Sequence, residues 1–195
     1  MTPTASDFTG FALREEALLL LDRRGAILEA AREISRALIE AKITGAVVGG
    51  IAVVLHGHVR TTKDIDIFID GPLIEMTGLL ERLGFLFDPN RREFTRDDVP
   101  VHLVTIQQVV NPPQAIIEIE GVTTISLADL IAMKLRSGTK NLLRAQDLAD
   151  VIGLARHHRL SPGFASKLPK ELRPDFRAIA KAIATELKGN PGRGG

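Results

Sequence analysis

The chain has 195 residues, of which 45% are hydrophobic and 25% charged, a balance typical of a folded globular protein rather than a disordered or fibrous one. Its 25 Lys and Arg residues against 24 Asp and Glu residues leave a formal charge of +1, so no overall positive field attracts a polyanion. The sequence has no cysteine, which excludes disulfides, thiolate nucleophiles and cysteine zinc sites.

Neither a secretory signal nor a membrane span is predicted. The first ten residues are polar and lack the basic start and apolar core of a signal peptide. The longest run without a polar side chain, 45–55, is much shorter than the ~20 residues that a spanning helix needs. We therefore expect a cytoplasmic protein with no membrane partner.

Hydrophobic periodicity predicts the elements of the first two thirds of the chain. Between Phe11 and Ile43 apolar residues recur every three or four positions, which predicts helices, and Gly25 divides them into two. Short apolar or alternating runs then predict strands, with helices between some of them. In order, these are a strand at 46–48, a short helix at 51–55, a strand at 65–69, a helix that Pro72 opens and Gly84 ends, strands at 85–87, 93–95 and 99–106, and a hairpin of 116–120 and 122–125 about Gly121.

From Ser126 the pattern becomes helical. Ser126 and Asp129 have the spacing of a capping box, and further helices are predicted over 141–157 and 174–188. We divide the chain into N-terminal helices packing on the core (1–43), a core built on a small mixed sheet (44–125), a C-terminal helical region (126–188) and a disordered tail (189–195). This order predicts the α+β class with an α/β-like sheet.

Two acids at the start of the strand predicted at 65–69 form the first candidate site. Side chains at i and i+2 of a strand share a face, so Asp64 and Asp66 project side by side while Ile65 and Ile67 enter the core. A divalent cation between the two carboxylates would relieve their repulsion, and hard oxygen ligands suit Mg²⁺. The alternative is a solvent-exposed strand face without a ligand.

A glycine pair between a strand and a helix forms the second candidate site. Gly49-Gly50 lets the backbone approach a ligand closely, and the start of the following helix attracts an anion. The alternative is a tight turn that needs a positive φ angle. Together the two features predict a phosphate cradle and a metal pair on neighbouring strands, which suits phosphoryl or nucleotidyl transfer.

These residues carry a resemblance to a known superfamily. Gly49-Gly50, His56-Gly57, Arg60, Thr62 and Asp64-Ile65-Asp66 resemble the motif of DNA polymerase β-like nucleotidyltransferases, and are most similar to the bacterial AbiEii-type branch, which includes toxins of toxin–antitoxin systems. The resemblance implies a nucleotidyltransferase core and catalysis with Mg²⁺ (or Mn²⁺) and an NTP. It assigns the metal to Asp64 and Asp66 and the nucleotide to Gly49, Gly50, Arg60 and Thr62. For Arg60 and Thr62 a solvated loop is the alternative.

The resemblance extends into the helical region. Leu130–Leu135 and Arg144–Asp150 look like that branch's "K-L … R-x-x-D-x-x-D" helices, which makes Lys134 and Asp147 candidate catalytic residues. Lys134 lies on the apolar stripe of its helix, where the functional interpretation directs the ammonium at the triphosphate and the alternative is a lysine that snorkels to solvent. Asp147 could reach Lys134 or the metal, or serve as an ordinary ion-pair partner. Asp150 is expected to point toward solvent.

One position departs from the superfamily pattern. A third carboxylate usually comes from a later strand, and His102 stands at the matching position. Either His102 acts as the base or third ligand, or another acid such as Glu118 substitutes, or the site binds nucleotide without turnover. Asp97 and Asp98 lie nearby but are expected in a turn.

Three hypotheses follow. The first is a metal-dependent nucleotidyltransferase that moves a nucleoside monophosphate from an NTP to a hydroxyl on an RNA, a protein or a small molecule. The second is a catalytically silent nucleotide-binding or interaction module of the same fold. The third is a toxin-neutralising or partner-binding protein. For the first hypothesis, a cognate antitoxin or another partner protein is a candidate partner.

Overall fold

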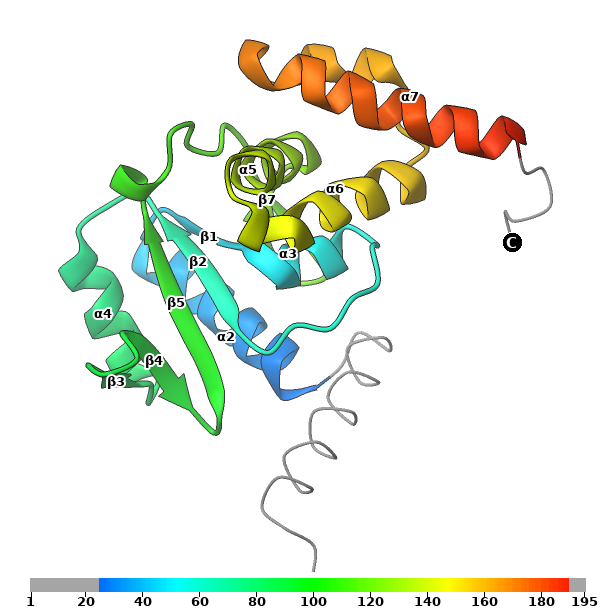
Figure 1. Cartoon of the computed structure of the whole chain (residues 1–195). Helices are drawn as coiled ribbons and strands as arrows, with labels where there is room; N and C mark the ends of the chain where they lie inside the picture. The colour runs from blue at the N-terminus through cyan, green and yellow to red at the C-terminus, as the bar shows by residue number, and fades with distance from the viewer. Residues whose placement is uncertain (1–24, 190–195) are drawn as a thin grey trace, which may run out of the picture. The chain divides into compact units, whose positions relative to one another are not determined.

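A computed structural model describes residues 25–189 of the chain (Figure 1). The helix predicted before Gly25, and residues 190–195 of the predicted tail, lie outside the described residues. The described chain forms two compact units. The first, here the sheet unit, runs to Leu55 and continues from Val59 to Ile125; the second, the helical unit, comprises His56–His58 and the chain from Ser126 onward.

A seven-stranded mixed sheet is the centre of the sheet unit, in the order β3-β4-β5-β2-β1-β7-β6. The central strand β2 pairs antiparallel with β1 and parallel with β5, while β1 pairs parallel with β7. The α+β class and the mixed sheet are thereby confirmed. The strands are β1 (Gly45–Val48), β2 (Ile65–Ile69), β3 (Leu86–Asp88), β4 (Glu93–Arg96), β5 (Val99–Thr105), β6 (Ile116–Ile119) and β7 (Val122–Ile125).

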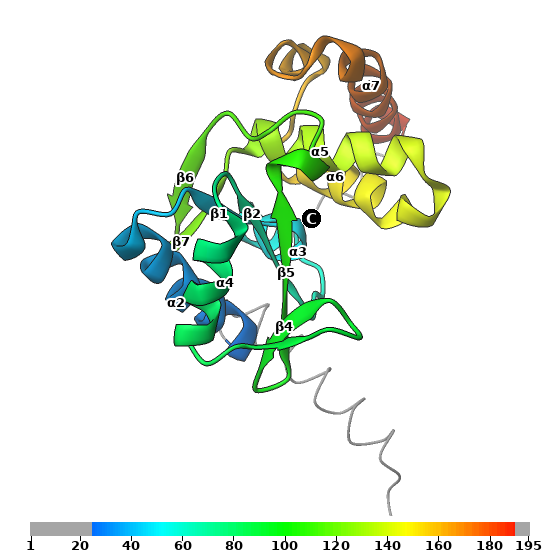
Figure 2. The same ribbon diagram turned by 90° about the vertical axis from the view of Figure 1, so that its left-hand side faces the viewer.

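Within residues 25–125, three helices accompany the sheet: α2 (Ala26–Ala41), α3 (Gly49–Leu55) and α4 (Leu73–Arg82). Helix α2 begins directly after Gly25, where the sequence predicts a boundary between helices. Gly25 has φ 106°. Helices α2 and α4 contact each other (Figure 2), and their apolar faces pack into one core with Ile65, Ile67 and Ile69 of β2. Because side chains alternate along a strand, the residues between these isoleucines face away from that core.

The helical unit contains α5 (Leu127–Lys140), α6 (Ala145–His157) and α7 (Arg173–Gly189). The amide of Asp129 donates to the Ser126 hydroxyl at 3.2 Å, which caps the start of α5 where the sequence predicts it. Short 3-10 turns at Leu142–Arg144, Pro162–Lys167 and Lys170–Leu172 were not predicted, because turns of three to six residues carry little periodic signal. Helices α5 and α6 pack against each other along the unit's core.

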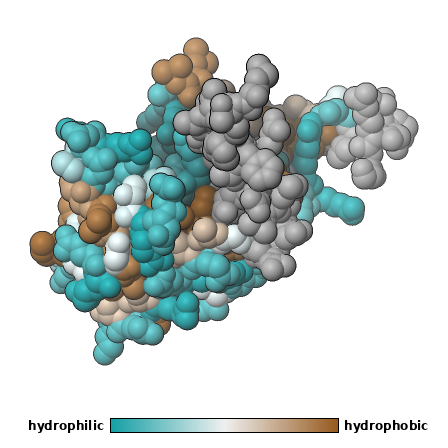
Figure 3. Space-filling view, turned by 90° about the horizontal axis from the view of Figure 1, so that it is seen from below, coloured by the Kyte–Doolittle hydropathy of each residue, from teal (hydrophilic) through white to brown (hydrophobic). Residues whose placement is uncertain are grey.

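On the face shown in Figure 3, hydrophilic residues surround smaller apolar patches. Among residues 25–189, no helix has the length and apolar character that crossing a membrane requires.

Candidate functional site

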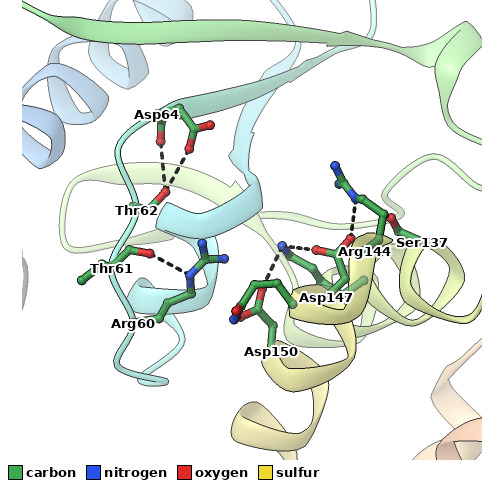
Figure 4. A network of polar contacts seen from close by, with 10 residues as sticks. Arg60, Thr61, Thr62, Asp64, Ser137, Arg144, Asp147 and Asp150 are labelled. Carbon is green, nitrogen blue, oxygen red and sulfur yellow. Dashed lines mark hydrogen bonds and ion pairs between the residues drawn. The ribbon is translucent and has the colours of Figure 1, made fainter. Parts of the chain in front are cut away.

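Asp64 and Asp66 lie at the start of β2 on the face of the sheet away from the α2–α4 core. Their side chains are 32% and 28% exposed, whereas Ile65 and Ile67 between and after them are fully buried. The Thr62 hydroxyl donates to Oδ1 of Asp64 at 3.0 Å (Figure 4), which fixes the direction of that carboxylate. The alternation of β2 thus places two carboxylates beside each other where a ligand can reach them.

The glycine pair lies directly against these acids. Gly49 has φ +66°, and a Cβ atom built on it would lie 1.9 Å from Oδ2 of Asp66. A Cβ atom on Gly50 would lie 2.3 Å from Oγ1 of Thr62 and 3.4 Å from Cζ of Arg60. Only glycine therefore leaves room for the carboxylate and the threonine, and the Gly49 position also needs the left-handed backbone that glycine adopts freely.

Strand pairing explains this closeness. In the register of β1 with β2, Val48 is opposite Asp66, so the bend at Gly49 follows directly beside the acid. Arg60 lies in the loop before β2, where its Nε donates to the carbonyl of Thr61 at 3.0 Å (Figure 4). The structure therefore brings together the predicted residues Gly49, Gly50, Arg60 and Thr62 with the two acids.

His102 of β5 also belongs to this cluster. It is opposite Asp66 in the parallel register of β2 with β5, and its Nδ1 lies 3.7 Å from Oδ2 of Asp64 and 3.6 Å from Oδ1 of Asp66. The exposed Glu118 lies on β6, which β1 and β7 separate from β2, so it does not substitute for the missing carboxylate. Of these two residues, His102 is the one that lies beside the two acids.

Glu93 is a further member that the sequence analysis missed. Its Oε2 lies 3.0 Å from Nε2 of His102, and its side chain is only 12% exposed. A signal for it exists in the sequence. The β4–β5 hairpin turns at Asp97 and Asp98, both with positive φ, and pairs Phe94 with Val101. Extending that register by one residue on each strand puts Glu93 opposite His102.

The donor set fits a divalent cation. Within residues 25–189, Asp64, Asp66 and His102 are the one group of three potential ligands whose donor atoms all lie within 4.8 Å of one another. Two carboxylates and an imidazole are ligands of divalent metal ions, and the space that a Gly49 side chain would fill holds the carboxylate of Asp66. The two acids and His102 would hold such an ion.

Lys134, Asp147 and Asp150 form a separate cluster inside the helical unit. The Lys134 ammonium lies 2.7 Å from Oδ1 of Asp147 and 2.9 Å from Oδ2 of Asp150, with all three residues buried. Arg144 adds a bond from its Nε to Oδ2 of Asp147 at 3.0 Å (Figure 4). The lysine therefore lies on the buried stripe, as its spacing predicts, and does not snorkel to solvent.

The expectation for Asp150 is wrong. Its side chain is fully buried, because α6 turns Asp147 and Asp150, three residues apart, toward α5 and Lys134. Burial alone would raise the pKa of Asp147. The hydrogen bonds from Lys134 and Ser137 and the positive charges of Lys134 and Arg144 outweigh that effect and lower the pKa below its ordinary value.

The mixed sheet carries two acids at the start of its central strand and a glycine bend after the neighbouring strand, as the resemblance to nucleotidyltransferases implies. Comparison with known families agrees. The family described as "Nucleotidyltransferase of unknown function (DUF6036)" matches residues 26–162, and the chain belongs to it. A search of curated proteins gives no significant match.

Solved structures show the same fold. An antigenic nucleotidyltransferase-like protein from Paracoccidioides brasiliensis is 18% identical, with a TM-score of 0.52 over 84% of this chain and 88% of that one. JHP933 from Helicobacter pylori is 16% identical, with a TM-score of 0.51 over 84% and 93%. ANT(2")-Ia, solved in complex with adenylyl-2"-tobramycin, is 18% identical, with a TM-score of 0.53 over 77% and 96%.

Proposed function

We propose that this chain is a metal-dependent nucleotidyltransferase that moves a nucleoside monophosphate from an NTP to a hydroxyl group of an acceptor. The observation that carries the proposal is the contact of the Gly49 backbone with the Asp66 carboxylate. A site of this kind lets backbone amides approach the phosphates while carboxylates beside them hold a cation. Membership of a nucleotidyltransferase family supports the same reaction class.

Each residue of the cluster takes a role in the proposal. Asp64 and Asp66 hold the ion, and the amides of Gly49 and Gly50 cradle the β and γ phosphates. Arg60 and Thr62 contact the nucleotide, with Thr62 also orienting Asp64 through its hydroxyl. A divalent cation, when bound, neutralises charge that develops on the triphosphate. His102 occupies the place of the acid that would accept the acceptor's proton or act as the third ligand.

For Lys134 we keep the predicted role of neutralising the leaving pyrophosphate. Within the helical unit this role requires the ammonium to leave Asp147 or Asp150, which both hold it in the structure. Asp147, predicted as catalytic, then acts by holding and releasing Lys134.

Three classes of acceptor are candidates. ANT(2")-Ia was solved with an adenylylated small molecule, adenylyl-2"-tobramycin, which makes a small-molecule hydroxyl one candidate acceptor here. An RNA or a protein is the other candidate acceptor. The motif's similarity to the AbiEii-type branch supports a proposed role as a toxin–antitoxin component, with a cognate antitoxin as the partner. Assays should therefore offer all three acceptor classes.

The test is transfer of label from α-³²P NTPs, with Mg²⁺ or Mn²⁺, to a cell extract, total RNA and a panel of hydroxylated small molecules that includes tobramycin. The wild-type chain should label an acceptor, and Asp64→Asn should reduce labelling by at least ~100-fold, because the metal loses a charged ligand. Asp70→Asn is the matched control, since Asp70 is an exposed acid just beyond the same strand. Equal labelling by wild type and Asp64→Asn would refute the proposal.

His102 at the third-ligand position favours a second candidate, a nucleotide-binding module without turnover. Calorimetry with NTP and metal separates the two. Tight binding without pyrophosphate release would identify the silent module, and release of pyrophosphate that depends on Asp64 would identify the enzyme.

A further inference from the structure

Both ring nitrogens of His102 face carboxylates, which distinguishes this cluster from a metal site made of carboxylates alone. Nδ1 faces the two acids at the start of β2, at 3.7 Å from Asp64 and 3.6 Å from Asp66. Nε2 faces the opposite way, 3.0 Å from the carboxylate of Glu93. These contacts come from three adjacent strands, β2, β5 and β4, so hydrogen-bonded pairing of the sheet holds them in place.

Glu93 determines which ring nitrogen can bind a cation. A carboxylate only accepts hydrogen bonds, so Nε2 must carry the hydrogen, and in the neutral ring Nδ1 then presents its lone pair. Glu93 is itself fixed, with Oε1 3.3 Å from Nη1 of Arg91 and a side chain that is 12% exposed. The lone pair of His102 is thereby directed at the two acids.

The distances across the cluster suit one shared ion better than direct hydrogen bonds. An N–H···O bond requires about 2.7–3.2 Å, which both Nδ1 distances exceed. Two donor atoms that each lie ~2.1 Å from one ion are at most ~4.2 Å apart, and 3.6 Å and 3.7 Å fall within that limit. The imidazole nitrogen is thus spaced from each of the two carboxylates as two ligands of one cation are.

We propose that Asp64, Asp66 and His102 form a mixed nitrogen–oxygen site that binds first-row transition-metal ions in preference to Mg²⁺, with Glu93 as the positioning residue of His102. Mg²⁺ prefers oxygen ligands, whereas an imidazole nitrogen raises affinity for later divalent ions such as Co²⁺ and Zn²⁺. A carboxylate behind a ligating histidine fixes its tautomer and orientation. The inference rests on the proposed function only in using the same site, and concerns which ion that site selects.

The test measures metal binding by the full chain without nucleotide. Isothermal titration with CoCl₂ and with MgCl₂ gives the ratio of the two dissociation constants, and the visible spectrum of bound Co²⁺ reports on its nitrogen ligand. Wild type should bind Co²⁺ at least ~10-fold more tightly than Mg²⁺. His102→Asp should lower that preference at least ~10-fold, and change the Co²⁺ spectrum.

Glu93→Gln tests the positioning role, because the amide keeps the size of the side chain but can donate as well as accept. It should weaken Co²⁺ binding by about 10-fold or more, while leaving Mg²⁺ binding by the two acids much less affected. Glu118→Gln, an exposed glutamate on β6 outside the cluster, is the matched control and should bind both ions as wild type does. Circular dichroism establishes that each variant is folded.

An unchanged preference in His102→Asp would overturn the inference, as would wild-type Co²⁺ affinity in folded Glu93→Gln. These failures are distinct from failure of the proposed function. If the chain prefers Co²⁺ but transfers no nucleotide, the proposed enzymatic function is refuted and the proposed metal site stands. If nucleotidyl transfer depends on Asp64 but the His102→Asp variant keeps the wild-type preference for Co²⁺ over Mg²⁺, the metal assignment is refuted and the proposed enzyme activity stands.

Discussion

Two pairs of aspartates in this protein have opposite surroundings. Asp147 and Asp150 are buried in the helical unit, where the ammonium of Lys134 contacts both and Arg144 adds a second positive charge beside Asp147. Asp64 and Asp66 are about 30% exposed on the sheet and face a histidine. A buried carboxylate needs a partner supplied by the fold, whereas a partly exposed pair can take its cation from solution. The first arrangement contributes to stability, and the second leaves the acids accessible to a ligand.

The largest expected effect comes from removing the internal cation. Lys134→Met leaves Asp147 and Asp150 buried without the ammonium, and should lower the free energy of unfolding by about 3–5 kcal/mol. Urea denaturation followed by circular dichroism measures this loss. Lys140→Met, at an exposed position of the same helix, should change it by less than ~0.5 kcal/mol. Equal losses in both variants would contradict the comparison.

Gly49→Ala should have the next largest effect on stability. The sheet site depends on the close approach of the Gly49 backbone to the Asp66 carboxylate, and not on a buried ion pair. The methyl group would meet Oδ2 of Asp66 and would require alanine to adopt φ +66°. We expect a loss of about 1–3 kcal/mol in unfolding free energy together with weakened metal binding. Gly71→Ala, where an added Cβ would have no heavy atom within 4 Å, is the control. Metal binding equal in the two variants would argue against the glycine cradle.

The pH dependence of stability should show a smaller effect, which comes from Asp147. Because the pKa of Asp147 is lower in the folded protein than in the unfolded chain, its charge stabilises the fold above the ordinary pKa of about 3.9. That stabilisation is lost as the pH falls through the folded value. Urea denaturation from pH 7 to pH 3 should show the stability difference between wild type and Asp147→Asn shrinking as the pH falls. A constant difference would contradict this assignment.

The smallest effect is expected at the sheet site. Asp64→Asn should change the free energy of unfolding by less than ~1 kcal/mol, since the side chain is partly exposed and the amide oxygen can still accept from Thr62. The same denaturation experiment measures it. A loss as large as that of Lys134→Met would show that Asp64 is structural and would remove the contrast.

Much of the local structure could be predicted from the sequence. The strand Ile65–Ile69 agrees with its prediction at both ends, and α2 starts directly after Gly25, because alternation and a glycine helix boundary are local signals. The 3-10 turns after α6 could not be predicted in this way. The burial of Asp150 depends on which neighbour α6 packs against, and a helical period alone does not identify that neighbour.

By itself the sequence determined that Asp64 and Asp66 share a face of one strand and that a glycine pair ends another, since both follow from residue spacing within a few positions. Only the tertiary structure decided that Gly49 touches Asp66, that His102 is opposite it and that Glu93 holds the imidazole. Those contacts depend on the order and register of β1, β2, β5 and β4. Strand order results from how the whole core packs, and residue spacing along one strand does not specify it.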